Sequence, residues 1–199
     1  MGFAGMLKTK LKHGLPDAYP ADNTKLLCSA GVVDAVCELG EFKTAYDFGA
    51  GTGIYVLELL KKGVRAIGIE LNEKDVRVEP ENWLVSDVGL DLTEELKLVD
   101  LCLSVECAEH IDKRVAGVFA RNLTMLSRDT IIMMASNEEG KYHVNTQPMR
   151  YWIELIERYG RHRHSREESI ELRKKLAEVV KGFGQKWFGE TMMVFRRVK

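Results

Sequence analysis

The stretch that decides the fold of this chain is Asp47-Phe48-Gly49-Ala50-Gly51-Thr52-Gly53, which is followed downstream by Gly68-Ile69-Glu70-Leu71. An apolar-leaning run, 43–48, leads into the glycines, and a helix-forming run, 53–62, follows them. Glycine at every second position lets the backbone turn sharply and approach a ligand more closely than a Cβ would allow. The carboxylate of Glu70, at the end of the next strand, can accept hydrogen bonds from both hydroxyls of a ribose. The pattern predicts a βαβ unit that binds a nucleotide-type cofactor.

The spacing of the glycines argues against a dinucleotide. The dinucleotide fingerprint is G-x-G-x-x-G, with the pyrophosphate at a helix N-terminus, whereas Gly53 comes one residue early. Asp47 stands two residues before the first glycine, where a carboxylate repels a pyrophosphate but suits a ligand that carries an amine or a cation. The chain also has no Tyr-x-x-x-Lys pair. An NAD(P)-binding oxidoreductase therefore stays only as a disfavoured alternative.

These motifs resemble those of the class I S-adenosylmethionine (SAM)-dependent methyltransferases over residues 43–136. Ser86-Asp87-Val88 resembles their adenine-contacting segment, and 100–106 resembles their fourth strand and the segment after it. The resemblance implies that Asp47 and the glycines cradle the methionine part and ribose of SAM or its product S-adenosylhomocysteine (SAH), and that Glu70 binds the ribose. The implied cofactor residues are Asp47, Phe48, Gly49, Ala50, Gly51, Gly53, Glu70, Leu71, Asp87, Val88, Ser104 and Glu106.

A second constellation, Glu106-Cys107-Ala108-Glu109-His110, comes where the fourth strand should end. It resembles the Glu-x-x-Glu-His segment of a subgroup that includes ubiquinone-pathway O-methyltransferases and small-RNA 2′-O-methyltransferases. In that subgroup the two acids, the histidine and a second histidine after the fifth strand can hold a divalent metal, and His143 stands in that last position. The same string also occurs without a metal, so a metal stays open. We expect His110, Glu109 and His143 to face the acceptor, with His110 as the first candidate for a general base.

The acceptor is less constrained. His143-Val144-Asn145, Tyr151-Trp152-Ile153, Trp187-Phe188 and Met193-Val194-Phe195-Arg196 resemble segments of small methyltransferases of bacteriophage genomes and polysaccharide clusters. The leading expectation is O-methylation of a small molecule or a glycan. The alternatives are a metal-dependent RNA 2′-O-methyltransferase, for which Arg161, Arg163 and the cations after them would form a basic patch, and a SAM-binding protein that transfers no methyl group.

Composition narrows the class of protein. The chain has 199 residues, 45% of them hydrophobic, and its 29 basic and 30 acidic residues give a net charge of −1. There is therefore no global basic field for nucleic acid. No apolar run reaches the ~18 residues of a membrane span, and the N-terminus lacks the pattern of a signal peptide. None of the four cysteines forms a C-x-x-C pair, which favours reduced thiols. We expect a cytoplasmic protein, monomeric or homodimeric.

Alternation of strand-like and helix-like segments predicts an α/β fold: a doubly wound, mostly parallel sheet of six or seven strands, with an antiparallel last strand and helices on both faces. The expected strands are 43–48, 65–71, 83–87, 99–105, 129–135, a faint strand at 161–164, and 191–197. The expected helices are 26–39, 53–62, 92–97, 112–126, 148–159 and 166–180. We expect one domain over 1–199, in which 1–41 forms a helical lid or cap, 42–136 the cofactor core, and 137–199 the acceptor side with the closing strand. Within the first of these segments, the helix at 26–39 is expected to pack on the sheet edge or to cover the cofactor.

Overall fold

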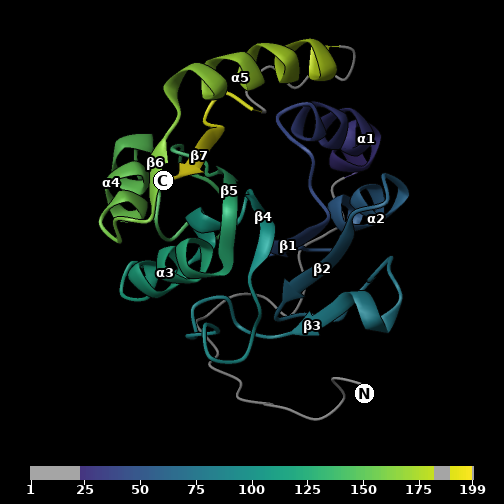
Figure 1. Cartoon of the computed structure of the whole chain (residues 1–199), viewed down its shortest axis with the longest axis horizontal. Helices are drawn as coiled ribbons and strands as arrows, with labels where there is room; N and C mark the ends of the chain where they lie inside the picture. Colours follow the sequence, from purple (N-terminus) through teal and green to yellow (C-terminus); the bar gives the residue numbers. More distant parts are fainter. Residues whose placement is uncertain (1–22, 182–188, 199) are drawn as a thin grey trace.

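The computed structural model describes residues 23–181 and 189–198, and its centre is a seven-stranded sheet of order β3-β2-β1-β4-β5-β7-β6 (Figure 1). The strands are β1 (Thr44–Phe48), β2 (Arg65–Glu70), β3 (Trp83–Val85), β4 (Val99–Val105), β5 (Ser127–Met134), β6 (His162–His164) and β7 (Met193–Arg197). Pairs from β3 through β5 are parallel, and β7 is antiparallel to both of its neighbours, β5 and β6. The predicted sheet, with its inserted antiparallel last strand, is confirmed, and the faint sixth strand is present.

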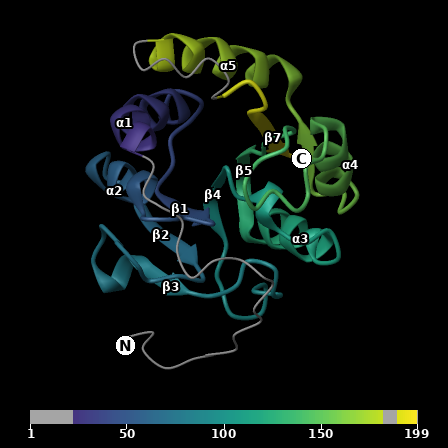
Figure 2. The ribbon, with the colours of Figure 1, turned by 180° about the vertical axis from the view of Figure 1, so that it is seen from behind.

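Helices cover both faces of this sheet. The helices are α1 (Asn23–Cys37), α2 (Ile54–Lys61), α3 (Ala116–Leu126), α4 (Met149–Glu157) and α5 (Arg166–Lys181). Figures 1 and 2 show α1, α2 and α5 on one side of the sheet and α3 and α4 on the other. Strand alternation explains the two layers: Leu101 and Leu103 of β4 pack with the first group of helices, whereas Cys102 packs with the second.

Residues 92–97 do not form the predicted helix; they make turns before β4. The carboxylate of Asp91 accepts hydrogen bonds from the backbone and hydroxyl of Thr93 and pairs with Arg121. The Asn122 side chain holds the backbone of the same segment by accepting from the Leu92 amide. Side chains that bond the nearby backbone in this way compete with helix formation. The prediction of a helix at 92–97 was wrong because polar side chains of the segment itself and of α3 set its conformation.

Smaller differences concern the ends of elements. The strand expected at 83–87 ends at Val85, and the helix expected from 112 begins at Ala116. The helix expected at 26–39 packs on a face of the sheet against α2 and α5 rather than at its edge, because Val32, Val33 and Val36 are all buried in the core of that layer. The expectations for Trp187-Phe188 and for 1–22 lie outside the described residues.

The order of the strands reverses between β1 and β4. Strand β1 pairs with β2 on one side and with β4 on the other. In open α/β sheets, ligands bind at the carboxyl ends of the strands where the order reverses in this way. The glycine loop follows β1 and the Glu106–His110 segment follows β4, so both predicted constellations lie at this strand reversal. Among the described helices, none is long and apolar enough to cross a membrane.

Candidate functional site

The glycine loop joins β1 to α2, and each of its three positions is glycine for a structural reason of its own. All three are left-handed, with φ of 75° at Gly49, 58° at Gly51 and 79° at Gly53. A Cβ on Gly49 would lie 2.2 Å from the sulfur of Cys107, and one on Gly53 would lie 3.1 Å from the Trp83 ring. A Cβ on Gly51 would meet no described atom within 4 Å. Gly49 and Gly53 are thus required by packing, whereas Gly51 borders open space that a ligand can fill.

Glu70 ends β2 directly beside this space. One of its carboxylate oxygens accepts a hydrogen bond from the Gly51 amide at 3.1 Å, and the other accepts from the amides of Leu71 at 2.7 Å and Asn72 at 3.3 Å. Burial raises the pKa of the Glu70 carboxyl, against the opposing effect of these three amides. Glu70 therefore fixes the glycine loop to the end of β2, where the sequence motifs predict that a ribose binds.

The residues expected around the adenine follow the next two strand ends. Leu71 is more than a third exposed, whereas Val88 is buried. One oxygen of Asp87 accepts from the Gly89 amide at 2.8 Å, and the charge of Asp87 contributes to the raised pKa of Glu70. The ends of β2 and β3 thus bring Glu70 and Asp87 near one another, with an apolar side chain exposed beside them.

Four further residues of the expected cofactor set are buried within the protein. Asp47 and Phe48 are buried in β1, and Ser104 is buried in β4. The Ser104 hydroxyl donates to the Phe48 carbonyl at 2.8 Å, so it ties β4 to the start of the glycine loop. Ala50 is buried, and its Cβ lies 2.9 Å from the position that a Cβ on Gly68 would occupy. These buried side chains support the conformation of the glycine loop.

Cys107 joins the two constellations, and sequence reasoning did not assign it a place there. Its buried sulfur packs against Gly49. Burial raises the pKa of the Cys107 thiol well above its usual range, and the charges of Glu70, Glu109 and Asp47 add to this effect. Carboxylates from β1, from β2 and from the segment after β4 therefore all disfavour ionisation of this thiol. Only the tertiary fold creates this contact, so no local sequence signal could have found it.

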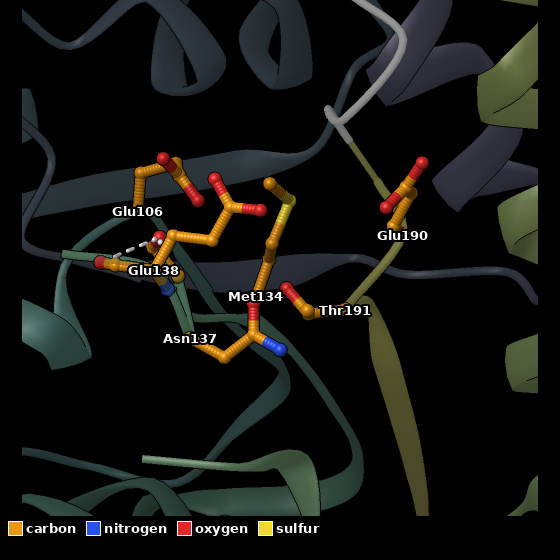
Figure 3. Close-up of a pocket in the computed structure, with 7 residues that line it drawn as sticks. Glu106, Met134, Asn137, Glu138, Glu190 and Thr191 are labelled. Atoms are coloured by element: carbon orange, nitrogen blue, oxygen red, sulfur yellow. Dashed lines mark hydrogen bonds between the residues drawn. The ribbon is translucent and has the colours of Figure 1, made fainter. Parts of the chain in front are cut away.

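Glu106, the first residue after β4, has a left-handed backbone with φ of 55°. Non-glycine residues in this region cost free energy and cluster at functional sites. Glu106 lines a cavity of about 30 Å³ together with Met134, Glu138 and Thr191, which is room for about two water-sized groups. Figure 3 shows the Glu106 and Glu138 side chains on one side of this cavity and Glu190 apart from them. The sequence did not identify Glu138, Glu190 or Thr191.

The fold brings Glu109, His110 and His143 together. One potential ligand atom from each lies within 4.8 Å of the others, and the two imidazole centroids are 4.9 Å apart at an angle of 80°. Glu109 is fully buried, and both histidines are partly buried. Glu106, the fourth residue of the expected metal set, is not a member of this cluster. Two imidazoles and one carboxylate form a donor set that suits a divalent transition metal.

Backbone carbonyls fix the orientation of both imidazoles. His110 Nδ1 lies 3.0 Å from the Tyr142 carbonyl oxygen, and His143 Nδ1 lies 2.8 Å from the Glu138 carbonyl oxygen. Because a carbonyl oxygen only accepts, each Nδ1 must donate, so each neutral ring carries its lone pair on Nε2. The amides of Val144 and Asn145 both donate to the Glu109 carbonyl at 2.9 Å, which binds the 136–145 loop to the segment after β4.

Tyr151 and Trp152, in the first turn of α4, have different environments. Trp152 is buried and packs edge-on against Phe119 at a centroid distance of 6.2 Å, as a core residue does. Tyr151 is only partly buried and lies under the ammonium group of Lys113, 5.8 Å from its ring centroid. Of this aromatic pair, only Tyr151 remains open to solvent.

Three of the cations expected to form a basic patch are engaged with other groups. Arg196 pairs with Glu168 and Asp129, and Lys175 pairs with Glu38. Arg173 donates to the Met192 carbonyl at 2.7 Å and is partly buried. These contacts neutralise or cover the charges that a nucleic acid would need.

No protein-family model matches this chain, and no curated protein does. Several solved structures are similar in fold. The plantazolicin methyltransferase BpumL, in complex with a pentazolic desmethylPZN analogue and SAH, is 12% identical with a TM-score of 0.63, over 90% of this chain and 87% of BpumL. A SAM-dependent methyltransferase from Archaeoglobus fulgidus is 16% identical with a TM-score of 0.58, over 87% of this chain and 93% of that protein.

A putative methyltransferase from an antibiotic biosynthesis pathway of Anabaena variabilis is 15% identical with a TM-score of 0.56, over 84% of this chain and 96% of that protein. At such identities the likeness concerns the fold alone. This chain therefore has the Rossmann-like fold that SAM-dependent methyltransferases share.

Proposed function

We propose that this chain is a SAM-dependent methyltransferase that methylates a hydroxyl group of a small molecule or a glycan. The observation that carries the proposal is the open space at Gly51, which lies beside Glu70 at the strand reversal of the sheet. A backbone that needs glycine there for its φ, with nothing from the described protein against it, fits a bound cofactor. In this proposal the carboxylate of Glu70 binds the ribose hydroxyls, and Asp87 binds the adenine.

SAM supplies an already activated methyl group, so the protein mainly has to place the acceptor and remove water from it. In this proposal His110 accepts the proton of an acceptor hydroxyl through Nε2; the hydrogen bond of its Nδ1–H to the Tyr142 carbonyl supports this role. His143 has the same tautomer and is the second candidate for this role. Glu106 would border the reacting centre from the end of β4.

A divalent metal would use the same side chains differently. Glu109, His110 and His143 would hold it, and it would lower the pKa of the acceptor hydroxyl. The two nitrogen ligands favour Mn²⁺ or Zn²⁺ over Mg²⁺, which prefers oxygen. One imidazole cannot serve as base and ligand at once, so the effect of EDTA on activity distinguishes the two arrangements.

The acceptor class is supported by proteins of similar fold. BpumL was crystallised with a pentazolic desmethylPZN analogue, and the Anabaena protein is described as a putative methyltransferase of an antibiotic biosynthesis pathway. An RNA 2′-O-methyltransferase is the second candidate, because the cluster of Glu109, His110 and His143 suits it. The engagement of Arg196, Arg173 and Lys175 disfavours it.

Two glycine substitutions test the cofactor site. Gly51 and Gly63 have φ of 58° and 80°, and a Cβ on either would meet no described atom within 4 Å. Gly51→Ala and Gly63→Ala should therefore each cost about 1 kcal/mol of stability from backbone strain. Only Gly51→Ala should weaken SAH binding, by at least tenfold, in calorimetric titration. Equal SAH affinity in both variants, or no SAH binding by the unmodified chain, would refute the proposal.

A further inference from the structure

The loop between β5 and α4 does more than carry His143. Within residues 138–143 it supplies a carbonyl to each imidazole of the cluster, from Glu138 to His143 and from Tyr142 to His110. Tyr142 has a left-handed φ of 67°, one of three non-glycine residues with positive φ among the described residues. A strained residue thus stands where the loop has to turn its carbonyl toward His110.

Gly140 packs directly on the ring of His143. A Cβ at Gly140 would lie 2.6 to 2.8 Å from three atoms of that imidazole, among them both ring nitrogens. Its φ lies outside the left-handed region, so the backbone does not itself require glycine there. The Gly140 carbonyl also accepts from the His143 amide at 3.1 Å. The position therefore needs a residue without a side chain because of the His143 ring alone.

We propose that residues 138–143 hold His110 and His143 in the Nδ1–H tautomer, in which the lone pair of each neutral ring is on Nε2, and that Gly140 is the positioning residue for His143. This inference rests on the proposed function, since it says which nitrogen of each imidazole in that site would take up a proton or a metal. Partners of metal-binding or catalytic histidines that fix tautomer and ring orientation typically change affinity by about 10–100-fold when they are lost.

The tautomer can be measured without any ligand. The chain has five histidines, so ¹⁵N-histidine labelling with single His110→Gln and His143→Gln variants assigns the two rings. Long-range ¹H–¹⁵N spectra above pH 8 should show a protonated Nδ1 and an unprotonated Nε2 in both rings. A protonated Nε2 in either ring would overturn the proposal, whatever the SAH and metal titrations give.

Gly140→Ala tests the positioning role, with Gly117→Ala as the matched control. Gly117 lies in α3, where a Cβ would come no closer than 3.9 Å to a described atom, the Tyr159 hydroxyl. Gly140→Ala should change the His143 spectrum and leave that of His110 largely intact, and it should weaken Mn²⁺ binding by about tenfold or more. Gly117→Ala should change neither. An unchanged His143 spectrum in folded Gly140→Ala would remove Gly140 from this role; absence of Mn²⁺ binding by the unmodified chain would instead refute only the metal part of the proposed function.

Discussion

At the scale of single residues, Glu106 combines backbone strain with a place at the site. It follows β4, has φ of 55°, and lines the small cavity with Glu138. Left-handed geometry in a non-glycine residue costs about 1 kcal/mol or more, and the fold retains it here. The cost is tolerated at a position where the residue directly follows β4 and lines this cavity.

We expect Glu106→Gly to raise the free energy of unfolding by about 1 kcal/mol, because it relieves this strain, and to weaken SAH binding. Asp75→Gly is the matched control, because Asp75 is an exposed residue with φ of 58° outside the candidate site. It should bring a similar gain in urea unfolding and leave SAH affinity unchanged. If Glu106→Gly were neither more stable nor weaker in binding, the strain would have no functional meaning.

The parts of the site that the sequence predicted are those imposed by the backbone. Alternate glycines and an acid at the next strand end can be recognised locally, and Gly51 and Glu70 lie together as expected. The roles of Cys107 and Tyr142 could not be predicted. Cys107 contacts Gly49 between the ends of two strands, and the backbone carbonyl of Tyr142 bonds His110. Both contacts depend on the tertiary fold and leave no local pattern in the sequence.

At the scale of elements, β6 was the least visible strand, because His162-Arg163-His164 has no apolar alternation. It forms because β7 offers an antiparallel edge, with His162 opposite Arg197. The His162 side chain is fully buried, and neither ring nitrogen has a hydrogen-bond partner among the described residues. Burial, together with the charges of Arg197 and Arg161 and against that of Asp129, lowers the pKa of His162 to about 4.

This histidine should make the chain sensitive to acid. Between the ordinary histidine pKa near 6.5 and about 4, the unfolded chain binds a proton that the folded chain excludes, so stability falls as pH falls. With screening of the two arginine charges, we expect a loss of about 2 kcal/mol. His162→Phe should remove most of this loss and be about 1 kcal/mol more stable at pH 7, because it buries no unbonded nitrogen.

Urea unfolding at pH 7 and pH 4.5 measures both effects. The decisive quantity is the difference between the two pH values, compared between wild type and His162→Phe, because the other titrating groups contribute equally to both proteins. Parallel losses in the two proteins would mean that another group carries the acid sensitivity.

At the scale of the whole molecule, both candidate sites lie at the carboxyl ends of the parallel strands. The expected cofactor residues come from the ends of β1, β2, β3 and β4, and the imidazole cluster comes from the segments that follow β4 and β5. Cys107 packs between them, against Gly49 and near the charges of Glu70 and Glu109. We therefore expect SAH and Mn²⁺ to bind at adjoining but separate positions.

A ligand that binds only the folded chain stabilises it by about 2.7 kcal/mol at a concentration one hundred times its Kd. For a chain of 199 residues, this corresponds to a rise in Tm of about 5–11 °C. SAH should produce such a rise, Mn²⁺ should do so if Glu109, His110 and His143 hold a metal, and NAD⁺ should produce none. The double variant His110→Ala/His143→Ala should lose the Mn²⁺ shift and keep the SAH shift, because Gly51 and Glu70 lie on the other strand ends. Loss of both shifts in a folded double variant would mean that the two ligands share one site. A shift with NAD⁺ equal to that with SAH would indicate that the glycine loop binds a dinucleotide.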